Sequence, residues 1–181
     1  AHVDAKLDAS LDRLFALLRI KSISADGEFA DECRRAGSHL SEELKGLGFA
    51  SEVRPTAGLP AIVARLPAGA ASGPHVLFYG HYDVQPVDPL DLWHRPPFDP
   101  VIADDSEGRK IIVARGAEDD KGQLMTFVEA CRAWKEVTGA LPLNVTILVE
   151  GEEEIGSKNF GPFLKEHRQD LAADYVLVCD T

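Results

Sequence analysis

Two segments near the N-terminus repeat apolar side chains at helical spacing. In residues 7–18, and again in residues 29–47, apolar residues recur every three or four positions, which places them on one face of a helix. Gly46 and Gly48 mark the C-terminal end of the second segment. Residues 122–137 show the same period, with Trp134 on the apolar face, and a shorter stretch follows at 157–167. The pattern predicts amphipathic helices in these four places.

Short runs of strand length lie between the helical segments. Three of them are apolar almost throughout, as expected of central strands that are covered on both faces. Strands that alternate with helices predict an α/β fold, here with a mixed, largely parallel central sheet and helices on both faces. A Gly- and Pro-bearing stretch, residues 67–74, predicts a surface loop. The predicted strands are residues 50–54, 61–66, 75–79, 110–113, 144–149 and 175–179.

Polar residues able to bind metal follow four of these strands. In open α/β sheets the ligand crevice lies outside the carboxyl ends of the strands, so side chains from separate strand ends converge there. We therefore expect an imidazole and several carboxylates to meet at one sheet edge. The residues delivered in this way are His81, Asp83, Asp119, Glu153, Glu154 and Asp180.

A mixture of imidazole and carboxylates without thiolates is typical of hydrolytic zinc, manganese or cobalt sites. Each piece has a plainer alternative. Asp119 fits the N-cap of the following helix, and the acidic run at 152–154 fits a solvated turn. A calcium module is disfavoured, because the sequence has no EF-hand spacing and a histidine sits among the acids. The convergence of all the pieces predicts a metal site.

Three motifs give the sequence a family resemblance. HYD follows an apolar strand, RGAEDDKG precedes a helix, and VEGEEEIGS follows the next strand. Together they resemble the M20 metallopeptidases, a family of dipeptidases, carboxypeptidases, aminoacylases and desuccinylases. The stretch WHRPPFDP at 93–100 is similar to one in dipeptidase-type members. The resemblance implies a zinc-peptidase-like fold and a hydrolase that cleaves a peptide or amide bond with water shared by two divalent cations.

The resemblance also implies a role for each residue. His81 and Asp180 match ligands of the first cation, and Glu154 matches a ligand of the second. Asp119 matches the carboxylate that bridges both cations, with Asp120 in a variable place. The catalytic pair consists of Asp83, which orients the histidine, and Glu153, which matches the general base. Zinc is the expected metal, with manganese or cobalt as alternatives.

The same resemblance implies that residues 1–181 are the first half of a catalytic domain. The family's last histidine ligand, its lid or dimerisation domain and the second catalytic half have no counterpart in this sequence. The expected substrate is a small peptide, a dipeptide first, and the full-length parent is expected to be a homodimer. Two alternatives stay open. The chain is an inactive or metal-binding fragment, or the enzyme is an N-acyl amino-acid deacylase or desuccinylase of the same family.

Composition narrows the partners. The 181 residues suit one compact domain, and the net charge of -11 argues against nucleic acid or an anionic membrane surface as partner. No apolar run is long enough for a membrane span. Cys33, Cys131 and Cys179 are widely spaced in apolar stretches and form no C-x-x-C, which predicts reduced core thiols and a cytoplasmic location.

Overall fold

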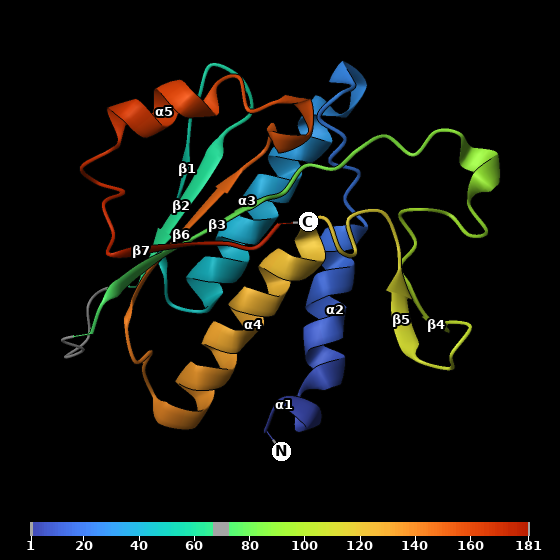
Figure 1. Ribbon diagram of the computed structural model, residues 1–181, viewed down its shortest axis with the longest axis horizontal. Coiled ribbons are helices and arrows are strands. Elements are labelled where there is room, and N and C mark those ends of the chain that lie inside the picture. The colour runs from blue at the N-terminus through green and yellow to red at the C-terminus, as the bar shows by residue number, and fades with distance from the viewer. Residues whose placement is uncertain (1, 67–72, 181) are drawn as a thin grey trace.

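The computed structural model describes residues 2–66 and 73–180, and it shows a central sheet flanked by helices (Figure 1). Within this part of the chain the sheet has five strands in the order β1-β2-β6-β3-β7. Its strands are β1 (Ala50–Arg54), β2 (Ala61–Arg65), β3 (His75–His81), β6 (Asn144–Glu150) and β7 (Tyr175–Val178). The helices are α1 (His2–Ala5), α2 (Leu7–Leu18), α3 (Ala30–Gly46), α4 (Lys121–Thr138) and α5 (Phe160–Glu166), with 3-10 turns η1 (Gly27–Phe29), η2 (Leu90–Leu92) and η3 (Glu153–Ile155).

The direction of the strands confirms a mixed, largely parallel sheet. β3 pairs in parallel with β6 on one side and with β7 on the other. β2 runs antiparallel to both of its neighbours, β1 and β6, so it is the single reversed strand of the described sheet. The carboxyl ends of β3, β6 and β7 therefore lie at the same edge.

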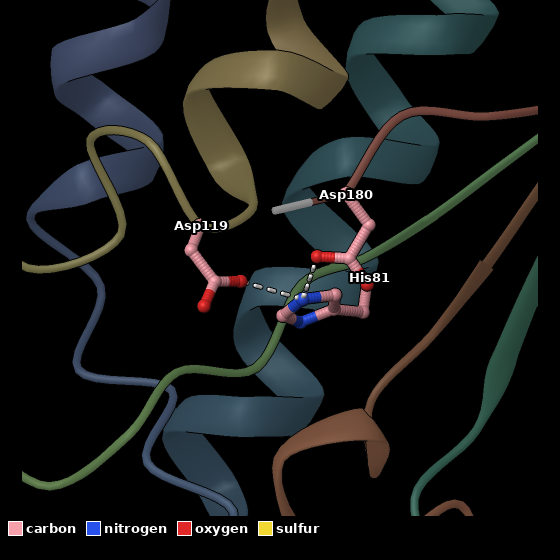
Figure 2. A group of neighbouring side chains, drawn as sticks. All are labelled: His81, Asp119 and Asp180. Atoms are coloured by element: carbon pink, nitrogen blue, oxygen red, sulfur yellow. Dashed lines mark hydrogen bonds and ion pairs between the residues drawn. The ribbon is translucent and has the colours of Figure 1, made fainter.

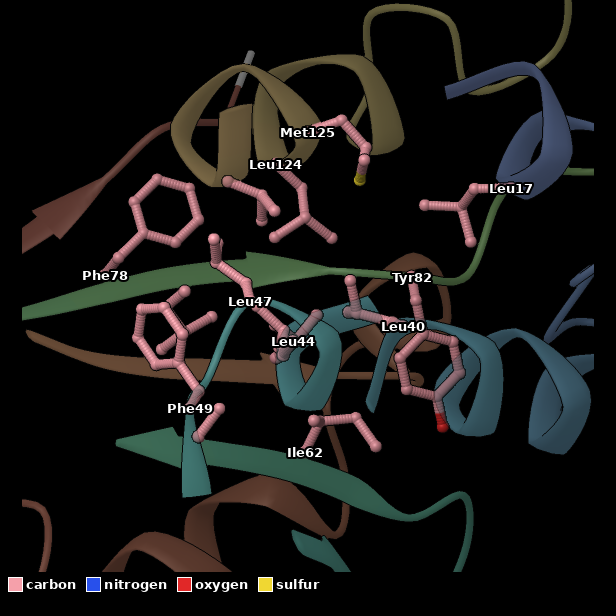
Figure 3. Packing of buried hydrophobic residues seen from close by; sticks show 14 of the residues in the cluster. Leu17, Leu40, Leu44, Leu47, Phe49, Ile62, Phe78, Tyr82, Leu124 and Met125 are labelled. Atoms are coloured by element: carbon pink, nitrogen blue, oxygen red, sulfur yellow. The ribbon is translucent and has the colours of Figure 1, made fainter. Parts of the chain in front are cut away.

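Helices cover both faces of the sheet, as the sequence predicts. Alternate strand residues point to opposite faces. Ile62 and Phe78 join the larger core cluster under α2, α3 and α4, whereas Val63 and Leu77 join a smaller cluster with Phe163 of α5. Figure 3 shows the larger cluster between the helices and the sheet. Labelled there are Leu17, Leu40, Leu44, Leu47, Phe49, Ile62, Phe78, Tyr82, Leu124 and Met125.

The structure corrects the sequence analysis in three places. The strand 175–179 is not central, because β7 is the last strand of the described sheet and its four residues are all exposed. Residues 110–113 form β5 (Lys110–Val113), which pairs with β4 (Val101–Asp104) in a separate two-stranded ribbon. Trp134 is half exposed, because the core contacts of α4 come from its earlier turns.

The burial of the cysteines, the loop at 67–74 and the absence of a membrane span are also predicted from the sequence. Cys33 and Cys131 are buried free thiols, whereas Cys179 is only partly buried. Most of the loop expected at residues 67–74 lies outside the described residues. Among the helices of the described ranges, none is both long and apolar enough to cross a bilayer.

Candidate metal centre

The candidate residues reach one region from four segments of the chain. His81 is the last residue of β3, Asp180 follows β7, and Glu153 and Glu154 open the η3 turn after β6. These positions follow from parallel strands whose carboxyl ends share an edge. Asp119 arrives differently, from the loop between the separate β5 strand and α4. Three strand ends and one helix-leading loop therefore build the site, in place of the four strand ends expected.

His81, Asp119 and Asp180 form the centre of the site (Figure 2). The imidazole Nε2 lies 2.9 Å from Asp119 Oδ1 and 3.8 Å from Asp180 Oδ1. One potential ligand atom from each residue lies within 4.8 Å of the other two. The imidazole is fully buried, whereas the Asp119 side chain is 43% exposed, so the cluster opens to solvent on that side. One nitrogen and two carboxylate donors fit a zinc-type divalent cation.

The Asp83 carboxylate is buried beside this cluster and joins two parts of the site. Its Oδ1 lies 3.3 Å from the Nδ1 of His81, whose ring nitrogen also lies 3.0 Å from the Asp83 carbonyl oxygen. The backbone amides of Glu153 and Glu154 donate to its two oxygens at 3.3 and 3.1 Å. Asp83 therefore orients the histidine and also holds the start of the η3 turn.

The two glutamates of this turn occupy different surroundings. Glu153 Oε2 lies 4.0 Å from His81 Nε2, at the border of the cluster. Glu154 is not among the three clustered residues. Its Oε1 accepts a hydrogen bond from the Gln85 backbone amide at 3.1 Å, and its Oε2 accepts one from the Gln85 side-chain amide at 2.7 Å. The Glu153 carboxylate thus lies beside the clustered atoms, whereas the Glu154 carboxylate lies outside the cluster and is bound by Gln85.

Glu150, a buried residue at the end of β6, holds the chain just after the η3 turn. The sequence pattern does not predict this role. The Glu150 Oε1 accepts hydrogen bonds from the hydroxyls of Tyr79 at 2.8 Å and Ser157 at 2.9 Å. Ser157 has a left-handed φ of 52°, which non-glycine residues seldom adopt. The turn that carries the two glutamates is therefore anchored at both of its ends.

Asp120 and Lys121 also have roles that the sequence did not reveal. Asp120 is completely buried, and its Oδ2 accepts a hydrogen bond from the His81 backbone amide at 2.8 Å. Lys121 Nζ donates to the carbonyl oxygens of Leu17 and Ile20, at 3.2 and 2.8 Å. Lys121 therefore caps the C-terminal end of α2. Nothing in the motif predicts either contact, since both depend on which backbone groups the fold brings near.

The site is rich in negative charge. Burial alone would lower the pKa of His81, but the hydrogen bond and charge of Asp83, with those of nearby aspartates, raise that pKa to about 10. Burial raises the pKa of Asp120 to about 7 and also raises the pKa values of Glu153 and Glu154. The cluster therefore attracts positive charge, which a bound cation would supply in place of a proton.

Comparison with known proteins places these residues in a known context. The sequence profile described as Peptidase family M20/M25/M40 matches residues 77–181, which contain every clustered side chain. A Cys-Gly metallodipeptidase of Schizosaccharomyces pombe is 32% identical in an alignment 190 residues long, gaps included. The alignment covers 99% of this chain and 39% of that protein.

Two solved structures resemble the chain in sequence and in fold. One is an M20 family metallo-carboxypeptidase from Sulfolobus solfataricus, with a TM-score of 0.84 and 36% identity over 95% of this chain and 37% of that one. The other is a dipeptidase from Saccharomyces cerevisiae, with a TM-score of 0.87 and 28% identity over 99% of this chain and 40% of that one. The chain thus spans about two fifths of the length of these proteins.

Proposed function

The chain belongs to the M20/M25/M40 peptidase family, and we propose that it carries the first part of a metal-dependent active site that hydrolyses a peptide or amide bond. The observation that supports this most is the cluster of His81, Asp119 and Asp180, whose potential ligand atoms lie within 4.8 Å of one another. Its donors suit zinc, with manganese or cobalt as alternatives.

The proposed division of roles follows the resemblance of the motifs to the family. His81 and Asp180 would hold a first cation, and Asp119 would supply a carboxylate shared with a second. Glu154, steadied by Gln85, is proposed as a ligand of the second. Divalent cations at such a site polarise the scissile carbonyl and lower the pKa of bound water.

Glu153 is proposed as the general base. Its carboxylate lies at the border of the cluster, 4.0 Å from His81 Nε2, and its side chain is 36% exposed, so solvent and substrate can reach it. It accepts a proton from the attacking water and delivers it to the leaving amine. Asp83 keeps the His81 imidazole oriented. The ring Nδ1 faces the carbonyl and carboxylate oxygens of Asp83, and the ring Nε2 faces the cluster.

We propose that further polypeptide completes the site and the domain, because the chain spans about two fifths of the length of its relatives. β7 offers a place for it, since it is the last strand of the sheet within the described residues and all four of its residues are exposed. A further histidine for the second cation, a lid or dimerisation domain and a homodimeric assembly are parts of the same proposal. The alternative is that the 181-residue chain by itself is an inactive or metal-binding fragment.

The proposed substrate is a small peptide, a dipeptide first. The names of the relatives support this choice, since they include a Cys-Gly metallodipeptidase and a dipeptidase. An N-acyl amino acid is the alternative substrate of the same chemistry. A location in the cytoplasm stays a prediction from the cysteines.

Two measurements test the proposal. In a protein that contains this chain and the remainder of the family's length, Glu153→Gln should keep the bound metal and lose nearly all cleavage of Cys-Gly. Glu166→Gln, an exposed change at the end of α5, is the matched control and should leave cleavage unchanged. Retained cleavage in the first variant contradicts the assignment of the base. Comparing dipeptides with N-acyl amino acids decides between the two substrate classes.

The isolated chain can be tested separately. Metal analysis that finds two tightly bound cations in the 181-residue chain, or measurable dipeptide cleavage by it, would contradict the fragment alternative. One cation or none, with no cleavage, would support it.

A further inference from the structure

The segment that follows α2 runs alongside the loop that follows His81. Ile23 forms an isolated parallel bridge with Val84. The Ser22 hydroxyl donates to the Tyr82 carbonyl oxygen at 2.7 Å, and the Val84 amide donates to the Ser22 carbonyl oxygen at 2.9 Å. The segment is therefore held firmly against residues 82–84, although some sixty positions separate the two in the sequence.

Ser24 is the one residue of this segment whose side chain reaches the Asp83 carboxylate. Its hydroxyl donates to Asp83 Oδ2 at 2.5 Å, the length of a charge-assisted hydrogen bond. Ser22, two residues earlier, bonds only to backbone. The two serines therefore share one segment, and only Ser24 contacts a residue of the metal site.

The Ser24 hydroxyl fills the last of four acceptor positions on Asp83. An ionised carboxylate offers about four such positions. Oδ1 faces His81 Nδ1 and the amide of Glu153, each at 3.3 Å. Oδ2 accepts from Ser24 and from the Glu154 amide, at 2.5 and 3.1 Å. Asp83 is completely buried, so removing one of these donors leaves an acceptor position that no other side chain of the site fills.

We propose that Ser24 is a positioning residue of the metal centre, an inference that rests on the proposed function. Its hydroxyl fixes the rotation of the Asp83 carboxylate. That rotation sets the His81 imidazole and the η3 turn, which carries Glu153 and Glu154, at a defined separation. Without the hydroxyl, the Glu154 amide is the one remaining donor to Oδ2 in the site. The carboxylate can then rotate away from either His81 or the amides of the η3 turn.

Ser24→Ala tests this proposal, with Ser22→Ala as the matched control and Ser24→Thr as the conservative variant. Zinc affinity of the chain is measured by titration calorimetry, and hydrogen exchange of the Glu153 and Glu154 amides is measured by NMR without metal. Ser24→Ala should weaken zinc binding about 10-fold, the size of effect seen when a group that supports a metal ligand is removed. It should also speed exchange of both amides, whereas Ser24→Thr should restore both properties.

The control separates positioning from loss of stability. Ser22→Ala removes a fully buried hydrogen bond and should lower the free energy of unfolding. It should leave the zinc affinity unchanged. The exchange rates of the Glu153 and Glu154 amides should change no more than those of amides in the sheet. Equal effects of the two alanine variants, or no effect of Ser24→Ala, would overturn the proposal for Ser24. If the unsubstituted chain binds no zinc, the fragment alternative is supported, and the metal-free exchange still decides the role of Ser24.

Discussion

The carboxylate of Asp120 accepts a hydrogen bond from the backbone amide of His81, with 2.8 Å between Oδ2 and the nitrogen. This contact joins the start of α4 to the end of β3, so it fixes Asp119, the neighbour of Asp120, relative to the imidazole. It depends on Gly80, because a Cβ at that position would lie 2.6 Å from Asp120 Oδ2. The absence of one side chain thus allows the two halves of the cluster to meet.

Replacing Gly80 with alanine should therefore strain the site. Because both Asp120 and the strand are buried, the crowding cannot be relieved toward solvent, and the free energy of unfolding should fall by about 1–3 kcal/mol. Urea denaturation followed by circular dichroism measures the change. Gly161→Ala, at an exposed position of α5 with open space around it, is the control and should not destabilise the chain. Equal stability of the two variants would contradict this account.

The three clustered side chains should each be needed for zinc binding. His81→Gln, Asp119→Asn and Asp180→Asn each remove a proposed ligand, so each should weaken binding by more than the ~10–100-fold expected for a supporting residue. Titration with zinc measures the affinity. Asp170→Asn is the control, because Asp170 pairs with Arg54 and Arg65 and is not a member of the cluster. A cluster variant that binds zinc as tightly as the unsubstituted chain would contradict the proposed centre.

The pair formed by Arg13 of α2 and Glu129 of α4 should stabilise the fold in a pH-dependent way. Two Arg13 nitrogens donate to the two carboxylate oxygens at 2.7 and 2.6 Å. Burial by itself would raise the pKa of Glu129, but the hydrogen bonds from Arg13 and Ser10 outweigh it and lower that pKa below 4.5. The stabilisation is therefore complete above the unfolded value of 4.5 and is lost as the pH falls through the lowered folded value.

Glu129→Gln should then cost about 1–3 kcal/mol of stability near neutral pH, and the difference from the unsubstituted chain should shrink at acidic pH. Urea denaturation at several pH values tests both statements. Glu42→Gln removes an exposed partner of Lys45 and should change stability little at any pH. A Glu129 effect that stays constant down to acidic pH would show that the charge of the pair is not its source.

The edge strand β7 should make the isolated 181-residue chain self-associate. Tyr175 and Val176 are each 64% exposed, and among the described strands β7 pairs with β3 alone, so its other side can accept a further strand. A charged residue at such an edge opposes pairing, so Val176→Lys should shift the chain toward monomer in analytical ultracentrifugation. Val137→Lys changes an equally exposed valine at the end of α4 and is the control. Similar behaviour of both variants would show that the edge does not drive association.

The periodicity of the sequence predicts most elements because burial of one face leaves a direct record in the chain. Residues 7–18 and α2 coincide, and the predicted strands near residues 50, 61, 75 and 144 begin where β1, β2, β3 and β6 begin. The record is weaker for position within the sheet. The apolar run at 175–179 has the composition of a central strand, but β7 ends the described sheet. Composition reports that a strand can be buried, not which partners bury it.

For the candidate metal-binding residues, too, the local pattern predicts which residues meet but not all of their contacts. The residue types and their places after strands predict His81, Asp119 and Asp180 as neighbours, and the structure brings these three together. Asp83 is predicted as the partner of the histidine, and the structure adds its contacts to Ser24 and to the η3 turn. Those contacts join segments far apart in sequence, and a serine or an amide carries no local signal of what it will meet.

The amino-acid pattern is enough to predict four of the five described helices, most strands, the α/β class and the residue types of the site, because these depend on the local period of apolar side chains and on motif chemistry. Three features emerge only from the folded chain: β5 lies outside the central sheet, Lys121 caps α2, and Asp120 accepts a hydrogen bond from the His81 amide. The first is a choice of strand partner, and the other two are hydrogen bonds between a side chain and a distant backbone group. Such contacts are set by the packing of the whole chain, so no window of the sequence contains them.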